Sequence, residues 1–272
     1  AFLDKDPTKR GNPLSYRLLL ILPTLYRRWA TYRLHSLKPW IRTWANRHFF
    51  AGVPGVGAED AWYLTSLQVE HAYMHDIDLS GSASDIYKCF DQILRPLLYV
   101  VAILAGIPSR IMRAYISYME ALVIYNTICG GLGSPYKKPC GIPQGCPLSM
   151  CFIALLMLPW TKYLSVDSIE PRFLADDMLV TCVGLQHENN LVQCNLFTHQ
   201  YIVDMGGRCA PDKSFIFPTC SKTRINLAKV VWPALGAVIP IIVDGRDLGA
   251  HINTANSTRN STLTNRLDEM CK

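Results

Sequence analysis

Phe-Leu-Ala-Asp-Asp-Met-Leu-Val, residues 173–180, places two carboxylates side by side between two short apolar runs. Apolar runs of this length that are rich in Phe, Leu and Val favour half-buried strands. Asp tolerates the backbone geometry of a tight turn. The pattern therefore predicts a β-hairpin that carries Asp176 and Asp177 at its tip.

Two carboxylates held this close repel each other, and one is driven toward protonation unless a cation lies beside them. The stretch contains no basic residue. Mg²⁺ binds carboxylate oxygens while keeping positions for water and phosphate. A metal-binding hairpin and an ordinary solvated Asp-Asp turn both fit this stretch, and a motif so short does not decide between them.

The composition is that of a globular chain, because 50% of the 272 residues are hydrophobic and only 18% are charged. The longest apolar runs, 97–107 and 230–243, are shorter than the roughly 18–20 residues of a membrane span, so we expect no membrane partner. The first residues are polar, with neither an initiator Met nor a signal peptide, which suggests a segment of a longer protein. Ten scattered cysteines without zinc-type spacing indicate reduced thiols in an intracellular protein.

Positive charge is concentrated at the start of the chain. Residues 1–50 hold ten Lys or Arg and two Asp, a net charge of +8, against +6 for the whole chain. A basic lobe joined to a nearly neutral body favours a polyanionic partner such as a nucleic acid. A basic helix face that is merely solvated is the alternative.

The first third of the chain is expected to begin with a loop at 4–17 and a strand-like run at 16–22. Pro23 favours the start of a helix. Its packed stripe is predicted to contain Leu25, Trp29, either Tyr32 or Arg33, Trp40 and Trp44, and its outward face to carry Arg27, Arg28, Lys38 and Arg42. Further helices are expected at 59–71, 97–107, 110–122 and 150–164, with two short strands before residue 137.

Asp-Ile-Tyr-Lys-Cys-Phe-Asp, residues 85–91, adds a third carboxylate. If Asp85 ends a strand, it can join Asp176 and Asp177 to hold two metal ions, as phosphoryl transfer requires. A helix cap is the plainer alternative. The run before it, Ser80–Ser84, is polar and is expected to be flexible, and Asp78 is a possible rival ligand.

Gly-Ile-Pro-Gln-Gly-Cys-Pro-Leu-Ser, residues 141–149, forms a loop, because Gly and Pro are dense there. Gly145 lets a ligand approach the backbone closely. The Gln144 amide offers both a donor and an acceptor to a sugar or a base edge.

Taken in order, D-I-Y-K-C-F-D (85–91), G-I-P-Q-G-C-P-L-S (141–149) and L-A-D-D (174–177) resemble palm motifs A, B and C of reverse transcriptases. Among reverse transcriptases, these motifs most resemble those of the non-LTR (LINE-type) retrotransposon and group II intron lineage. K-D-P-T-K with S-Y-R (5–17) and F-A-G-V-P-G (50–55) resemble the fingers motifs of these enzymes. Residues 207–214 resemble motif D, and 247–249 resemble the primer-grip motif E.

The resemblance implies an α+β right-hand polymerase with fingers and palm, the palm being a ferredoxin-like antiparallel sheet with helices, and with the thumb largely missing. The implied parts are basic fingers at 1–75, the palm with motif A at 76–96, a fingers–palm connection at 97–140, the palm with motifs B to E at 141–252, and the start of the thumb at 253–272.

The resemblance also implies roles for individual residues. Asp85, Asp176 and Asp177 would be catalytic and would bind two Mg²⁺ or Mn²⁺ ions, and Lys213 would protonate the leaving pyrophosphate as a general acid. The nucleotide site would comprise Arg17, Lys9 (or Lys5), Ile86, Phe90, Gln144 and Gly145. Leu248 and Gly249 would belong to the primer grip.

Phe90 indicates the choice of sugar. Its ring would lie under the incoming sugar and exclude a 2′-hydroxyl, where similar RNA-copying RNA polymerases usually have Asp. The expected partners are therefore an RNA template, a DNA primer and dNTPs, in the nucleus if the parent is a LINE-type element.

The sequence departs from the family pattern at Leu174, where Tyr or Phe is usual, and at Met150, where Pro is usual. With the polar run before Asp85 and the missing thumb, these departures favour a catalytically silent nucleic-acid-binding scaffold as the alternative. An RNA-dependent RNA polymerase is a third interpretation. An unrelated paired-carboxylate hydrolase fits the Asp residues but leaves the Pro-Gln-Gly loop unexplained.

Overall fold

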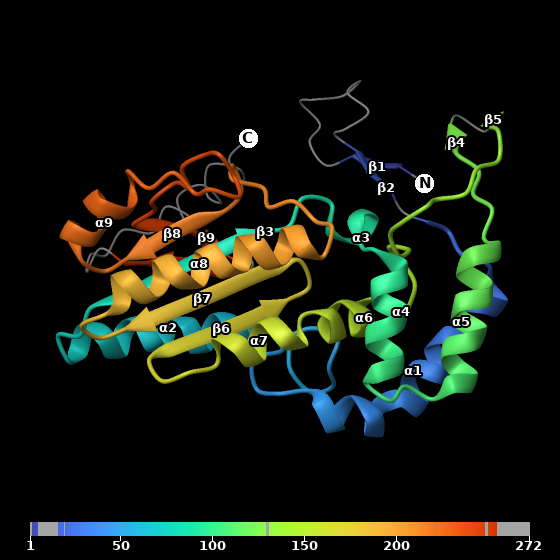
Figure 1. Cartoon of the computed structure of the whole chain (residues 1–272), viewed down its shortest axis with the longest axis horizontal. Coiled ribbons are helices and arrows are strands. Elements are labelled where there is room, and N and C mark those ends of the chain that lie inside the picture. Colours follow the sequence, from blue (N-terminus) through green and yellow to red (C-terminus); the bar gives the residue numbers. More distant parts are fainter. Residues whose placement is uncertain (1, 5–15, 19, 129–130, 248–249, 255–272) are drawn as a thin grey trace, which may run out of the picture. The chain divides into compact units, whose positions relative to one another are not determined.

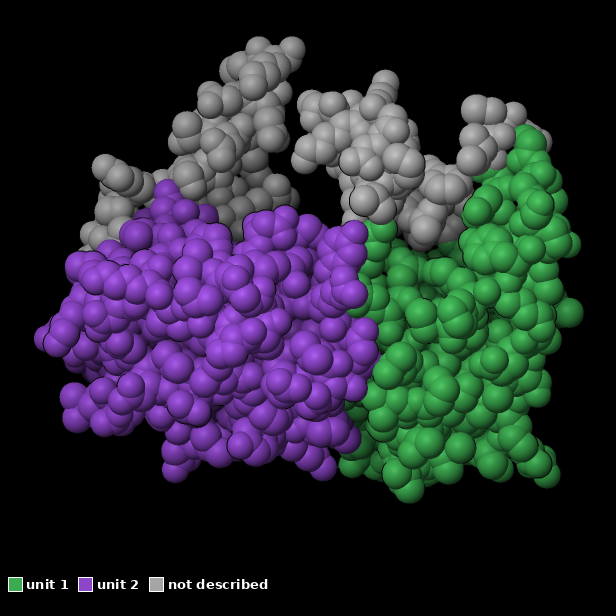
Figure 2. All heavy atoms as spheres, turned by 45° about the horizontal axis from the view of Figure 1, so that its top comes forward, with its two compact units in different colours: residues 1–45, 88–156 green, residues 46–87, 157–272 purple. Residues whose placement is uncertain are grey.

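The computed structural model describes residues 2–4, 16–18, 20–128, 131–247 and 250–254. The chain divides into two compact units, coloured separately in Figure 2. Unit 1 comprises residues 1–45 and 88–156, and unit 2 comprises residues 46–87 and 157–272. These boundaries differ from those of the predicted functional parts, which stay a prediction.

A four-stranded antiparallel sheet forms the body of unit 2. Its strands are β3 (Leu79–Asp85), β6 (Ile169–Leu174), β7 (Asp177–Val183) and β8 (Phe215–Pro218), in the spatial order β6-β7-β3-β8. Each neighbouring pair is antiparallel. With helices between the first and second strands and between the third and fourth, this is the split β-α-β-β-α-β arrangement. The predicted ferredoxin-like palm is confirmed.

Helices cover both faces of this sheet (Figure 1). On one face lie α7 (Leu158–Leu164) and α8 (His187–Asp204), joined by a hydrogen bond of 2.9 Å from Trp160 Nε1 to Thr198 Oγ1. On the other face lies α2 (Ala58–Met74). The core beneath α2 is built from Val69, Ala72, Leu79, Leu179, Phe217 and Ile252.

The central strand β3 is polar in sequence yet fully enclosed. Ser80 and Ser82 are buried and face α8. The Ser80 hydroxyl lies 2.6 Å from His187 Nδ1, and the Ser82 hydroxyl donates to Asn195 Oδ1 at 2.6 Å. The expectation of a flexible run is wrong, because a polar face of α8 supplies the partners that let these hydroxyls be buried.

The β6–β7 hairpin has a two-residue turn, Ala175-Asp176, since Leu174 pairs with Asp177. Ala175 has a φ of +61°, in the left-handed region that favours glycine. A positive φ at the first turn position is typical of a type II′ turn, which matches the twist of the flanking strands. The predicted hairpin is confirmed, with Asp176 in the turn and Asp177 as the first residue of β7.

Unit 1 is mainly helical. Its helices are α1 (Thr24–Trp44), α3 (Cys89–Gln92), α4 (Arg95–Leu104), α5 (Ser109–Ala121) and α6 (Ser149–Leu156). Two short antiparallel pairs accompany them, β1 (Phe2–Asp4) with β2 (Tyr16–Leu18) and β4 (Thr127–Ile128) with β5 (Gly131–Leu132). Helix α4 packs on α5 and α6, and the buried Tyr115 ring meets Phe152 edge-on with 4.7 Å between centroids.

The buried face of α1 matches the predicted one only in part. Trp44 is buried, and Arg27, Arg28 and Arg42 are exposed, as expected. Leu25 and Tyr32 are 82% and 69% exposed, whereas Tyr26 is buried. The Tyr26 ring stacks on Tyr118 of α5 with 3.7 Å between centroids, and its hydroxyl lies 3.2 Å from Cys146 Sγ. Helical spacing alone does not determine whether Leu25 or Tyr26 faces the core. The contacts of Tyr26 with Tyr118 and Cys146 bury Tyr26.

The helix predicted at 150–164 is two helices, α6 and α7, that meet at Met157. Pro159 lies in the first turn of α7, where its missing N–H costs no hydrogen bond. The last described elements of unit 2 are α9 (Ser221–Leu227), β9 (Asp244–Asp247) and β10 (Ala250–Asn253). No helix of the described residues is both long and apolar enough to cross a bilayer.

Candidate active site

Three carboxylate residues that are far apart in the sequence meet at one end of two adjacent strands. Asp85, the last residue of β3, is the register partner of Asp177, the first residue of β7. The backbone N–H of Ile86 donates to the carbonyl of Asp176 at 3.3 Å. Opposed residues of an antiparallel pair have Cα atoms roughly 4.5–5.5 Å apart. The backbone therefore brings all three positions to the tip of the hairpin.

The loop at 207–214, the predicted motif D, pairs with the chain where β3 ends. Tyr87 N donates to Arg208 O at 2.8 Å, and Ala210 N donates to Asp85 O at 2.9 Å. The Asp85 N–H donates to the Ser214 hydroxyl at 3.1 Å. Asp85 is thus held on both sides, by β7 and by this loop.

Lys213 of the same loop reaches the carboxylate itself, with its Nζ 3.3 Å from Asp85 Oδ2. The Asp85 side chain is 16% exposed and that of Lys213 is 53% exposed, so water screens the pair from one side. Lys213 was predicted as a general acid, but this contact was not foreseen, because 128 residues separate the two in the sequence.

The donor atoms suit the expected metal, since carboxylate oxygens are the ligands that Mg²⁺ and Mn²⁺ prefer. Among the described residues, however, no three His, Cys, Asp or Glu side chains are grouped as a metal site. The pairing of β3 with β7 brings the three Asp residues to one place, as metal binding would require. Their assignment as metal ligands stays a prediction. Asp78 is no rival, because it lies at the opposite end of β3, roughly 20 Å away along the strand.

In unit 1, the Pro-Gln-Gly loop is hydrogen-bonded to the end of motif A and to the residues just after it. Ile142 N donates to Phe90 O, and Gly141 N donates to Ile93 O, both at 2.8 Å. Gly141 has a φ of +83°, and a Cβ there would lie 2.7 Å from Asp91 O. Only glycine fits this position. Its missing side chain lets the loop lie directly against the backbone of Phe90 and Asp91.

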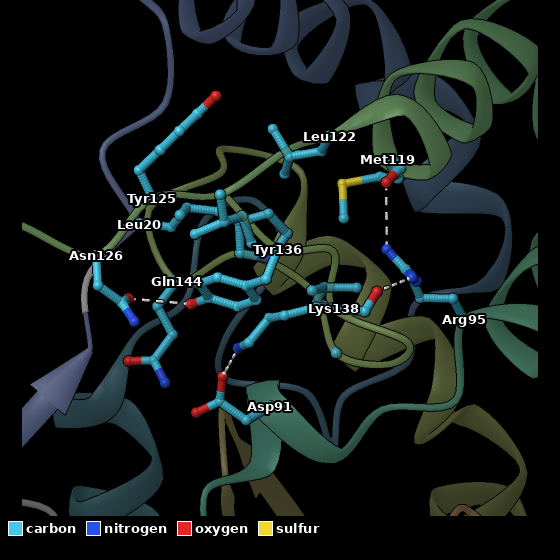
Figure 3. A pocket seen from close by; sticks show the side chains of 14 residues that line it. Leu20, Asp91, Arg95, Met119, Leu122, Tyr125, Asn126, Tyr136, Lys138 and Gln144 are labelled. Atoms are coloured by element: carbon cyan, nitrogen blue, oxygen red, sulfur yellow. Dashed lines mark hydrogen bonds and ion pairs between the residues drawn. The ribbon is translucent and has the colours of Figure 1, made fainter. Parts of the chain in front are cut away.

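The same loop forms one wall of a cavity of about 60 Å³, shown in Figure 3. The Lys138 ammonium pairs with the Asp91 carboxylate inside it. The buried Arg95 guanidinium donates to the backbone carbonyls of Met119 and Lys138. Gln144 lies on the wall, so a polar amide borders a small enclosed space beside the loop. No local sequence signal pointed to the Lys138–Asp91 pair.

The structure does not test several of the predicted site residues. Lys5, Lys9, Leu248 and Gly249 lie outside the described residues. Arg17 lies in β2, but only its backbone is described. Phe90, Gln144 and Gly145 belong to unit 1, whereas Asp85, Ile86 and the Asp pair belong to unit 2. The joint nucleotide site across both units stays a prediction.

Comparison with solved structures supports the fold. The chain resembles telomerase from Candida albicans in complex with a TWJ fragment of telomeric RNA, with a TM-score of 0.54, 16% identity, and coverage of 94% of this chain and 48% of that chain. It also resembles apo telomerase from Candida tropicalis, with a TM-score of 0.53, 13% identity, and coverage of 88% and 41%. A third similar structure is telomerase from Candida tropicalis in complex with the TWJ fragment of telomeric RNA. Its TM-score is 0.52 and its sequence identity 14%, and the match covers 72% of this chain and 34% of that chain.

The chain thus spans between about a third and a half of the length of these structures. At such low identity the likeness concerns the fold alone. None of the curated proteins compared with this sequence matches it. Residues 5–226 match the family model described as reverse transcriptase (RNA-dependent DNA polymerase). With the palm topology and the hairpin of Asp176 and Asp177 in place, this match shows that the chain belongs to the reverse transcriptase family.

Proposed function

We propose that the chain is the RNA-directed DNA polymerase core of a retroelement of the LINE-type and group II intron lineage. It adds dNTPs to a primer 3′-hydroxyl on an RNA template. The observation that carries the proposal is the strand register, which sets Asp85 opposite Asp177 and places Asp176 in the adjoining turn. In a LINE-type element the protein would work in the nucleus.

Asp85, Asp176 and Asp177 would hold two Mg²⁺ or Mn²⁺ ions. When bound, the ions supply activation of the 3′-hydroxyl and neutralise charge on the transferred phosphate. Lys213, whose Nζ lies 3.3 Å from Asp85 Oδ2, would give a proton to departing pyrophosphate. The chain's own contribution would be the three carboxylates and a proton donor beside them.

The other assigned residues bind and orient the nucleotide. Arg17 and Lys9 would contact the triphosphate, since a guanidinium suits bidentate phosphate binding. Phe90 would exclude the 2′-hydroxyl of an rNTP. Gln144 and Gly145 would line the nucleotide site, with Leu248 and Gly249 at the primer end.

The test is primer extension on an RNA template with Mg²⁺ and dNTPs. Asp176→Asn and Asp177→Asn are each expected to reduce incorporation by about 100-fold or more, because each removes a charge that the transition state requires. Asp78→Asn is the matched control, since it changes a carboxylate at the far end of β3 and should leave the rate unchanged. Equal rates in all three variants would refute the proposal.

The second candidate is a catalytically silent RNA-binding scaffold on the same fold. The Lys213–Asp85 ion pair favours it, because an ammonium already neutralises a carboxylate that the reaction needs. This candidate predicts RNA binding at low salt without metal-dependent extension. Any dNTP incorporation that Asp177→Asn abolishes would exclude it, and preferential rNTP incorporation would instead indicate an RNA-dependent RNA polymerase.

A further inference from the structure

A hydroxyl, an imidazole and a carboxylate are aligned at the edge of the unit 2 sheet, away from the residues assigned to polymerisation. Ser165 Oγ lies 2.7 Å from His48 Nε2. On the other side of the ring, His48 Nδ1 lies 3.4 Å from Glu170 Oε1. This is the order of groups with which serine hydrolases activate a nucleophile.

The imidazole is held in place by its own backbone. The chain at 48–50 runs along the edge of β6, where Phe173 N donates to His48 O at 2.8 Å and Phe50 N donates to Phe173 O at 2.9 Å. His48 N donates to Asn46 Oδ1 at 3.0 Å. The His48 side chain is 4% exposed, so the ring has little freedom to turn away from Ser165.

The carboxylate is ionised and orients the ring. Burial would raise the pKa of Glu170, but the neighbouring His48 ring and the charges of Arg47 and Arg172 lower it below its ordinary value. Arg47 Nη2 also lies 3.1 Å from Glu170 Oε2. A carboxylate beside Nδ1 favours the tautomer with its proton there, which leaves the Nε2 lone pair facing the Ser165 hydroxyl. The Nδ1–Oε1 distance is long for a hydrogen bond, and such contacts often tighten when substrate binds.

The exposure of its serine to solvent distinguishes the Ser165–His48–Glu170 group from a similar group in the same unit. Ser80, His187 and Asp78 also lie in line, but Ser80 is fully buried and cannot meet a substrate. Ser165 is exposed and opens onto a recess of about 380 Å³. That recess is lined by Arg47, Gln68, Ser165, Asp167, Ser168 and Glu170.

Ser165 is the C-cap residue of α7, where its backbone N–H donates to Thr161 O at 3.1 Å, so a structural role at the helix end is the plainer explanation of its position. The cap does not require a carboxylate on the far nitrogen of the ring, nor an open recess beside the hydroxyl.

We propose that Ser165 is a nucleophile that His48 activates as general base and Glu170 positions, and that it takes the acyl group of small uncharged esters. Ser165 Oγ bonds to the ester carbonyl carbon while its proton passes to His48 Nε2. The carbon–oxygen bond to the alcohol breaks, and the alcohol leaves with that proton. Water then cleaves the serine ester by the same route and releases the acid. This activity is independent of polymerisation.

A fluorophosphonate probe tests the nucleophile in the intact chain. Ser165 Oγ displaces fluoride from phosphorus, and the label remains on the serine. We expect one label per chain, found on Ser165 by peptide mass analysis, with labelling slower by about 100-fold in His48→Gln, the size of general-base assistance. Glu170→Gln, which keeps the shape but removes the charge, should slow labelling by about ten-fold at an unchanged melting temperature.

Ser221→Ala is the matched control, because it removes an exposed hydroxyl of α9, outside the recess, and should label like the parent chain. The urea-unfolded chain should not label. If His48→Gln does not fold, Glu170→Gln and the unfolded chain decide the question. The proposal is wrong if Ser165 stays unlabelled, if label spreads over many serines, or if folded and unfolded chains label equally.

Discussion

At the scale of single residues, Asp85 shows how two segments of the chain meet at one carboxylate. Its backbone is bonded to the loop at 207–214, and its side chain faces the Lys213 ammonium. The same ammonium would act as a proton donor in an active polymerase and as a neutralising cation in a silent scaffold. Removing it therefore discriminates between them.

Lys213→Ala is expected to reduce the rate of dNTP incorporation by about 100-fold or more if Lys213 is the general acid. The melting temperature should barely change, because an ion pair this exposed contributes only about 0–1 kcal/mol. Single-turnover primer extension and thermal unfolding check the two expectations. Lys222→Ala, an exposed lysine of α9, is the control. An unchanged rate would remove Lys213 from the chemistry.

Phe90→Ala is expected to relax the choice of sugar, because it removes the ring that would exclude the 2′-hydroxyl. The ratio of dNTP to rNTP incorporation should fall by about ten-fold or more, the usual scale for losing one steric contact. Competition between dCTP and CTP in primer extension measures it. Phe90→Tyr keeps the ring and should retain the preference. Equal ratios in all three proteins would contradict the assignment.

At the scale of elements, β3 depends on what packs over it. The serine hydroxyls on one face of β3 form hydrogen bonds with side chains of α8. The other face packs against an aromatic ring of β8. A Cβ on Gly81 would lie 2.2 Å from Phe217 Cζ, and Phe217 is fully buried. The ring lies over the glycine backbone, in space that a side chain would otherwise fill.

Gly81→Ala is therefore expected to destabilise the protein by about 1–3 kcal/mol through overpacking. Phe217→Leu in the same chain should recover part of that loss, so the two changes should not be additive. Urea unfolding of the single and double variants measures the coupling. Additive losses would mean that the ring moves aside freely.

At the scale of the whole molecule, unit 2 carries a buried imidazole that stays neutral when the protein folds. His199 of α8 is 1% exposed and lies edge-on to Trp232, with 5.5 Å between ring centroids. Burial lowers the pKa of His199 to about 4 from an ordinary 6.5. Between these two values the unfolded chain binds a proton that the folded chain does not, so stability falls as the pH is lowered.

His199→Phe keeps an aromatic ring and removes the titration. The parent chain is expected to lose roughly 3 kcal/mol more than the variant between pH 7 and pH 4, the free energy that corresponds to this lowering of the pKa. Urea unfolding across that range measures it, and groups that titrate in both proteins cancel in the difference. Parallel stability curves would show that His199 takes up its proton in the folded state.

The sequence by itself predicted the palm, the hairpin with Asp176 and Asp177, and Asp85 at a strand end. These features depend on local patterns, because alternating apolar runs, turn residues and ordered motifs are readable within a few residues of each other. The same locality explains why the helices α2 and α5 were predicted within a few residues of their observed bounds.

Only the tertiary structure decided which face of α1 is buried, why a serine-rich strand lies at the centre of the sheet, and that Lys213 meets Asp85. Each of these depends on a partner more than 90 residues away in the sequence: Tyr118 for Tyr26, His187 for Ser80, and Lys213 itself for Asp85. The physical reason is that burial and hydrogen-bond satisfaction are properties of contacts, and no local pattern records which distant residue supplies the contact.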